Sequence, residues 1–286
     1  MLTAAFTLLF ATSTAAFSLH RRSPLLHRKS PIIKASLAQD TQATASVSRR
    51  DALGAALASG ISLSTRSSSA AIAADKAKVV VVGTGLVGSY VVQQLAKEGV
   101  AVVAVARSSP SEQADKVKKL LGTNPSGVEY VSIDASTGDL SGVLAGASAC
   151  ISCVGVIPGS KDQLAGNGAV NVRIADAAKA AGVGRFVYVS VGSAISGGPG
   201  KFIFGDYMKG KAQAEAAVSK DYGKTNALIV RPNVISGGPP GGLPGPPGVP
   251  AVPVQAVAAA AVAGALGKQS GVLDGAEEII AGGSSS

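Results

Sequence analysis

From residue 78 onward, short apolar runs alternate with segments whose apolar positions recur at helical spacing. Residues 78–82 are apolar after the first position, which is typical of a strand buried on both faces of a parallel sheet. A helix pattern follows at 86–97, and the alternation continues along the chain, so the sheet is expected to be parallel. The further expected elements are strands at 101–106, 128–133, 149–154, 185–190 and 227–230, and helices at 112–121, 140–144, 163–181 and 207–219.

Six such strands predict an α/β fold, a doubly wound Rossmann sheet of six to seven strands with helices on both faces. Residues 236–253 are crowded with Gly and Pro, so we expect no regular secondary structure there. The loop should lie outside the carboxyl ends of the strands, where ligands bind in such folds. An Ala-rich helix at 254–266 and a last strand at 278–281 complete the prediction.

Residues 1–74 differ in composition from the rest and resemble a targeting leader. Residues 2–17 are apolar and end in small residues, as in a signal peptide. A basic, Ser-rich segment without an acid before Asp40 follows, and then Arg49 and Arg50 precede a weak apolar run, as in a twin-arginine signal. This order predicts a plastid destination, including the thylakoid lumen. The alternative is a single mitochondrial or plastid presequence.

The leader also carries most of the positive charge. The net charge is +9, and residues 1–74 hold eight Lys or Arg against two Asp or Glu. Residues 75–286 hold eighteen against fifteen, without a basic run or interleaved aromatic residues. Nucleic-acid binding is therefore not expected. We expect residues 1–74 to be removed or disordered, and 75–286 to form one nucleotide-binding domain.

A glycine-rich motif lies directly between the first strand and the first helix, the context that dinucleotide binding requires. Gly83 permits the tight turn, Gly85 lets a pyrophosphate approach the backbone, and Gly88 lets helix and strand pack closely. The helix N-terminus then faces the phosphates. A Rossmann fold that keeps this loop without its ligand is the alternative. The expected cofactor-binding residues here are Gly83, Thr84, Gly85, Leu86, Val87 and Gly88.

The second strand ends in Arg107, where an NAD-selective domain would place an acid on the ribose 2′-hydroxyl. A guanidinium can pair with the 2′-phosphate of NADP, so we expect NADP, with NAD as the alternative. An ordinary solvated arginine is the other interpretation. Asp134, after the third strand, is a candidate for the adenine edge, although Asp is also a common turn residue.

Tyr207 and Lys211 are spaced so that the phenol and the ammonium share one helix face. A nearby ammonium lowers the pKa of a phenol, and the pair could then transfer a proton to or from a substrate oxygen. Ser190 or Ser193 is the candidate for orienting a carbonyl, with Ser193 favoured. A turn or cap role is the alternative for either serine.

Metal chemistry is not expected. The two cysteines, Cys150 and Cys153, lie in a short apolar run where residues three apart point to opposite faces, so we interpret them as buried structural thiols. No second Cys or His cluster completes a zinc site, because both histidines lie in the leader.

Together these motifs resemble the atypical, NmrA-like branch of the short-chain dehydrogenase/reductase superfamily. The similarity is greatest to the group that contains the Rossmann-type accessory subunit of mitochondrial complex I, a coenzyme Q biosynthesis protein and plastoglobule-associated plastid proteins. The resemblance implies that Val154 and Gly155 flank the nicotinamide, and that Asn167 or Asn171 belongs to the helix under the site. The matching pieces are 80–88, 150–155, 167–171, 182–190, 207–211 with Glu215, and 230–232.

Two functions follow as hypotheses. The first is an organellar NADP-dependent oxidoreductase that acts on a small hydrophobic carbonyl or quinone-related compound. Here Tyr207 is the general acid or base, while Lys211 lowers its pKa and holds the ribose. The second is a non-catalytic accessory or assembly factor that binds NADP(H) at a membrane complex or a lipid droplet, since the group includes proteins that hold the nucleotide for structural reasons.

Overall fold

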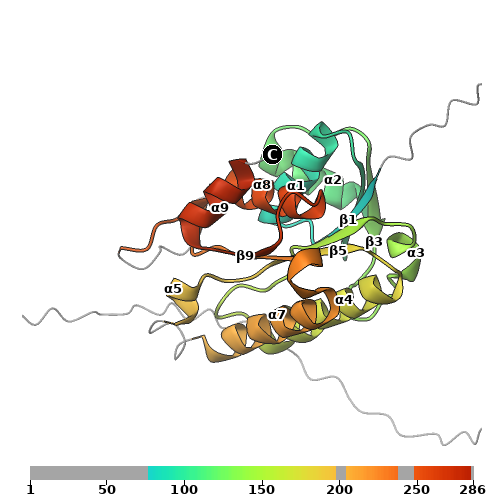
Figure 1. The fold of residues 1–286 in the computed structure, drawn as a ribbon. Coiled ribbons are helices and arrows are strands. Elements are labelled where there is room, and N and C mark those ends of the chain that lie inside the picture. Colours follow the sequence, from blue (N-terminus) through green and yellow to red (C-terminus); the bar gives the residue numbers. More distant parts are fainter. Residues whose placement is uncertain (1–76, 198–203, 238–247, 285–286) are drawn as a thin grey trace, which may run out of the picture. The chain divides into compact units, whose positions relative to one another are not determined.

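A seven-stranded sheet forms the centre of the computed structural model, which describes residues 77–197, 204–237 and 248–284 (Figure 1). The strand order is β3-β2-β1-β4-β5-β6-β9, and every neighbouring pair is parallel. The expected doubly wound α/β fold is therefore confirmed, while the expected leader lies outside the described residues. The strands are β1 (Lys78–Val82), β2 (Ala101–Ala106), β3 (Val128–Ser132), β4 (Ala149–Ser152), β5 (Arg185–Val189), β6 (Ala227–Arg231) and β9 (Gly271–Asp274).

Helices cover both faces of this sheet (Figure 1). α1, α8 and α9 pack against one another on one face, and α4 and α7 pack together on the other. α2 lies beside α1 and contacts β3. The helices are α1 (Leu86–Lys97), α2 (Pro110–Leu121), α3 (Ser141–Leu144), α4 (Val170–Ala180), α5 (Ser193–Ser196), α7 (Gly205–Asn226), α8 (Val254–Ala265) and α9 (Gly275–Ser284).

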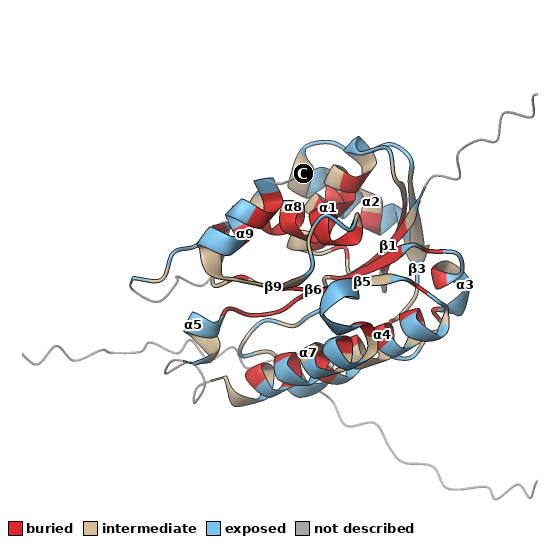
Figure 2. Cartoon of the chain, viewed as in Figure 1, coloured by how far each residue is buried: buried red, intermediate tan, exposed pale blue. Residues whose placement is uncertain are grey.

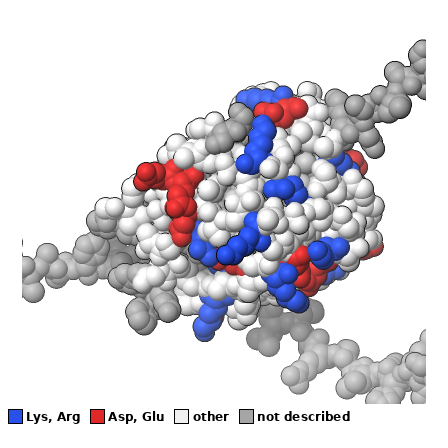
Figure 3. Space-filling model, in the orientation of Figure 1, with Lys and Arg blue, Asp and Glu red and all other residues white. Residues whose placement is uncertain are grey.

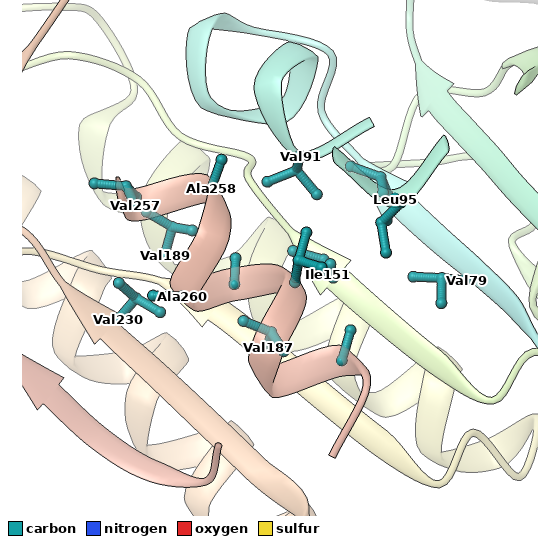
Figure 4. Close-up of a cluster of buried hydrophobic side chains, with 14 of the residues drawn as sticks. Val79, Val91, Leu95, Ile151, Val187, Val189, Val230, Val257, Ala258 and Ala260 are labelled. Carbon is teal, nitrogen blue, oxygen red and sulfur yellow. The ribbon is translucent and has the colours of Figure 1, made fainter. Parts of the chain in front are cut away.

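The two helix layers explain why the strands are apolar at nearly every position. Val79 and Val81 of β1 belong to the core under α1 and α8, whereas Val80 and Val82 belong to the core under α4 and α7. Alternate side chains of a strand point to opposite faces, so a strand covered on both sides needs both sets to be apolar. Figure 4 shows α8 lying across the sheet, beside strand side chains such as Val187. In Figure 2 the central strands are mostly buried, whereas the helices are exposed on their outer sides.

The expected last strand at 278–281 is wrong, because these residues belong to helix α9. Ile279, Gly282 and Gly283 are its buried residues, which is helical spacing. A Cβ on Gly282 would lie 2.5 Å from Leu273 Cδ1, so the helix packs closely on β9 through glycines. Glycines have no apolar side chain, so the hydrophobic pattern of the sequence does not reveal this buried face. The last strand is instead β9, which pairs with β6.

One other expectation about regular structure needs correction, and a second needs detail. Residues 236–253 were expected to hold none, yet β7 (Ile235–Ser236) pairs with β8 (Val252–Pro253) at the two ends of the segment. Residues 238–247 lie outside the described residues. The helix expected at 163–181 is present: residues 163–164 are helical, a π-helix follows, η1 (Ala165–Ala169), and the helix continues as α4. π-Helical turns are frequent at functional sites.

Acidic and basic side chains are interspersed on the face shown in Figure 3. Within the described ranges, no helix is both long enough and apolar enough to cross a membrane.

Candidate functional site

A cavity of about 490 Å³ lies at the carboxyl ends of β1, β2 and β4. The strand order reverses between β1 and β4, and open α/β sheets bind ligands at this switch point. The segments that follow these strands and β3 form most of its wall. The cavity residues used below are Gly83, Thr84, Gly85, Arg107, Ser108, Lys116, Asp134, Ser136, Cys153, Val154, Gly155 and Val156.

The glycine loop forms the centre of this wall, and its packing explains why glycine is required. A Cβ on Gly88 would lie 1.8 Å from the Gly83 carbonyl oxygen, so any side chain there displaces the loop. Gly83 has φ +98°, and a Cβ on it would lie 3.0 Å from the Cys153 backbone. A Cβ on Gly85 meets no described atom within 4 Å, which leaves its backbone open to a ligand.

The other predicted loop residues differ in their positions. Thr84 lines the cavity but is buried, and its hydroxyl faces Gln113. Leu86 and Val87 begin α1 outside the cavity wall, and Val87 packs against the core. No acidic side chain occupies the first turn of α1. The first amide groups of this helix therefore have no intrahelical acceptor and no carboxylate partner in that turn. Such free amide groups at a helix N-terminus favour the binding of an anion.

Arg107 and Lys116 lie on the cavity wall beyond β2, and both residues are exposed. Asp134 lines the same end. Its Oδ1 accepts hydrogen bonds from the Ser136 amide at 2.9 Å and the Ser136 hydroxyl at 2.6 Å. These bonds, with a smaller contribution from Arg107, lower the pKa of Asp134. Asp134 thus closes a turn and also keeps a carboxylate at the cavity.

Two buried asparagines hold the segment after β4, which forms the cavity wall opposite Arg107. Asn171 Nδ2 donates to the Val154 carbonyl at 3.2 Å, and the Ser152 hydroxyl donates to Asn171 Oδ1 at 2.6 Å. Asn167 Nδ2 donates to the Val156 carbonyl at 3.1 Å, and the Val156 amide donates to Asn167 Oδ1 at 3.2 Å. η1 and α4 therefore fix the backbone on both sides of Gly155.

Tyr207 and Lys211 do share one side of α7, next to this wall. Lys211 Nζ donates to the Val189 carbonyl at 3.0 Å and lies 5.8 Å from the Tyr207 ring centroid and 5.1 Å from that of Tyr188. A Cβ on Gly155 would lie 3.4 Å from Lys211 Nζ, which places the ammonium beside the cavity wall. The expected lowering of the Tyr207 pKa is not found. Burial raises this pKa, and the Lys211 ammonium, which donates to the Val189 carbonyl, does not offset the desolvation.

The two candidate serines have different surroundings. Ser190 is 5% exposed, and its hydroxyl has no hydrogen-bond partner among the described residues. It follows β5 two residues after Tyr188, whose side chain faces α7. Ser193 is exposed and begins α5, and its amide donates to Asp274 Oδ1 at 3.0 Å.

The cysteines are free thiols on opposite sides of the sheet, as the spacing predicted. Cys150 belongs to the core under α4 and α7, and Cys153 packs against the other core and lines the cavity. Burial raises the pKa of both thiols, that of Cys153 to about 12. Reactive cysteines have lowered pKa values, so these two have the properties of inert packing groups.

Burial of Lys211 has a consequence for stability. Burial lowers the pKa of Lys211 from 10.5 to about 8, so unfolding takes up a proton between these two pH values. The free energy of unfolding should therefore rise with pH across this window, by up to roughly 3 kcal/mol relative to a Lys211→Met variant. Urea unfolding of both proteins at pH 7.5 and pH 10.5 measures this difference. A difference that does not change with pH would show that Lys211 is solvated.

Two site residues were not identified from the sequence. Lys116 and the buried Gln113 lie on α2, whose start was expected at residue 112. Ser109 and Glu112 form a capping box that starts the helix at Pro110, and this signal is present in the sequence. The hydrogen bonds of Gln113 depend on three separate elements and leave no local pattern.

Comparison with known proteins agrees with this geometry. The protein family described as NAD(P)H-binding matches residues 83–268, which is well over half of the chain. An uncharacterized chloroplastic protein of Arabidopsis thaliana is 32% identical over 181 residues, which cover 62% of this chain and 58% of that protein. The match thus spans less than two thirds of the length of this relative.

Solved structures show the same fold at low sequence identity. A Bacillus halodurans protein described as an NAD-dependent epimerase/dehydratase is 20% identical, covers 72% of this chain and 97% of its own, and has a TM-score of 0.53. The UDP-N-acetylglucosamine 4-epimerase of Methanobrevibacter ruminantium M1 is 16% identical, covers 71% and 77%, and also has a TM-score of 0.53. The chain belongs to the NAD(P)H-binding family, and it shares the Rossmann fold of these solved structures.

Proposed function

We propose that the protein is an NADP-dependent oxidoreductase that reduces a small hydrophobic carbonyl or quinone-related compound. The observation that carries this proposal is the arrangement of charged and proton-bearing groups around one cavity. Arg107 and Lys116 lie beyond β2, and Lys211, with Tyr207 beside it, adjoins the opposite wall at Gly155. The glycine loop lies between these two ends.

The preference for NADP over NAD rests on the two cations beyond β2. The 2′-phosphate distinguishes the two nucleotides, and a guanidinium can pair with it through two hydrogen bonds. Arg107 is exposed at the position where NAD-selective domains carry an acid, and Lys116 lines the same end of the cavity. Together they give this end a positive charge next to Asp134.

Replacing Arg107 with serine should weaken NADPH binding about 10- to 100-fold, because charge-assisted hydrogen bonds to the 2′-phosphate are lost. NADH binding should change less than about threefold. Fluorescence titration of both nucleotides measures the effect, and Lys118→Ser is the matched control, since Lys118 lies on α2 outside the cavity wall. Equal losses for the two nucleotides would refute the role of Arg107.

NADPH supplies a hydride to the substrate when bound. The chain must then provide a proton for the substrate oxygen, and Tyr207 is the proposed donor. Burial raises the pKa of Tyr207 and thus keeps the phenol protonated at neutral pH, as reduction of a carbonyl requires. Lys211 supplies positive charge 5.8 Å from the ring centroid and stabilises the phenolate that remains.

Ser190 is the serine that this proposal favours, in place of Ser193. A buried hydroxyl without a partner is costly unless a ligand satisfies it. Ser190 has such a hydroxyl and lies two residues beyond Tyr188, on the side of β5 that faces α7. Its proposed role is to donate a hydrogen bond to the substrate oxygen beside Tyr207.

One observation favours the second function, a nucleotide-binding accessory factor of a membrane complex or quinone-biosynthesis assembly. Lys211 Nζ already donates to the Val189 carbonyl, so it is engaged within the protein. A plastid location is part of both proposals and is supported by the chloroplastic relative and the composition of residues 1–74. Imaging the full chain with a C-terminal fluorescent tag separates plastid from mitochondrion.

The two functions are separated by the oxidation of NADPH in the presence of a panel of quinones and small carbonyl compounds. The oxidoreductase proposal predicts that absorbance at the nicotinamide band falls with at least one of them. Tight NADPH binding without turnover, together with stable association with a membrane complex, would favour the accessory factor.

A further inference from the structure

Helix α2 buries a polar side chain, Gln113, beside the apolar Val117. Only Gln113 and Val117 are buried on this helix, and Gln113 is 0% exposed. A buried amide is costly unless its donors and its acceptor are satisfied. A fully buried glutamine on this helix therefore needs an explanation beyond packing.

The two polar atoms of the Gln113 side chain make three hydrogen bonds, which reach the cavity wall and the strand beside it. Its Nε2 donates to the Ser108 carbonyl at 2.9 Å and to the Val131 carbonyl at 3.0 Å. Its Oε1 accepts from the Thr84 hydroxyl at 3.5 Å. Thr84 belongs to the glycine loop, and Ser108 follows Arg107. One side chain thus joins the segments after β1 and β2 to strand β3.

The start of α2 fixes this side chain in place. The Ser109 hydroxyl accepts from the Glu112 amide, and Glu112 Oε2 accepts from the Ser109 amide at 2.8 Å. This capping box and Pro110 set the first turn directly after Ser108. Gln113 follows in the next position, where its amide can turn back to the chain before the helix.

We propose that Gln113 is a positioning residue that sets the selectivity of the site between NADPH and NADH. By holding the Ser108 carbonyl against β3, it fixes the backbone that carries Arg107 at a defined distance from the glycine loop. A second hydrogen bond on this segment, from the Ser132 hydroxyl to the Arg107 carbonyl, is longer at 3.2 Å and more exposed than the two bonds of Gln113 Nε2. This inference rests on the proposed preference for NADP.

Gln113→Met keeps the length of the side chain and removes all three hydrogen bonds. The ratio of the NADH to the NADPH dissociation constant should fall about five- to tenfold, because Arg107 loses its fixed position while the glycine loop remains. Fluorescence titration of wild type and variant with both nucleotides measures the ratio. Gln113→Asn retains an amide but is one methylene too short for all three partners, so its ratio should be intermediate.

The matched control is Val117→Ala, one turn further along the same buried face of α2. It leaves a cavity and lowers the melting temperature, but it breaks none of the Gln113 bonds, so the ratio should stay within about twofold of wild type. An unchanged ratio in whichever Gln113 variant folds overturns the inference, as does an equal change in Val117→Ala. If Arg107→Ser abolishes the preference while the Gln113 variants keep it, the proposed function stands and only this inference fails. A wild-type protein without NADPH preference overturns both.

Discussion

Gly88→Ala is expected to abolish measurable NADPH binding and to lower the free energy of unfolding by about 1–3 kcal/mol. The added methyl group would lie 1.8 Å from the Gly83 carbonyl oxygen. Gly83 cannot move aside, because its amide donates to the Val105 carbonyl at 2.8 Å and it packs against the Cys153 backbone. The glycine loop must therefore change shape. Fluorescence titration with NADPH and urea unfolding measure the two effects.

The same substitution at two other glycines separates loop shape from ligand contact. Gly85→Ala meets no described atom, so stability should be retained while NADPH binding falls, because the methyl group projects from the open backbone at the centre of the wall. Gly142→Ala, on α3 and equally free of close contacts, should change neither property. Normal NADPH affinity in Gly88→Ala would mean that the nucleotide binds elsewhere.

Tyr207→Phe should lower the turnover of a reducible substrate by about 10²- to 10⁴-fold, which is the usual contribution of a positioned proton donor. The NADPH dissociation constant should change less than about twofold, because Tyr207 lies outside the cavity wall. Steady-state kinetics with NADPH and the best compound from the quinone and carbonyl panel measures turnover.

Tyr90→Phe is the matched control for this substitution. Tyr90 packs against the core on the α1 side, away from the cavity wall, so turnover should be that of wild type. Unchanged turnover in Tyr207→Phe would assign proton transfer to another group and would strengthen the accessory-factor alternative.

The fold could be predicted because its causes are local. Apolar strands such as β1, the glycine loop and helical spacing in α1 each leave a pattern within a few residues. The error at 278–281 arose because α9 packs through Gly282 and Gly283, which lack apolar side chains, while two adjacent isoleucines suggested a strand. Tertiary packing overrode local propensity there.

The site could be predicted only in part, for a related reason. Gly83, Arg107 and Gly155 follow strand ends, so their meeting at one cavity follows from the topology. The bonds of Gln113 to Thr84 and to Val131 join segments distant in sequence, and no local pattern of residues predicts them. The pKa of Tyr207 was misjudged because the pattern shows a neighbouring ammonium but not the depth of burial, which is the larger effect.

Titration of the protein with NADPH and with NADH, followed by nucleotide fluorescence at constant ionic strength, tests the central claim most directly. The cavity with Gly83, Gly85 and the cations Arg107 and Lys116 predicts saturable binding of both, with NADPH bound at least about tenfold more tightly. Tighter binding of NADH would contradict the role given to Arg107, and binding of neither nucleotide would contradict the assignment of the cavity itself.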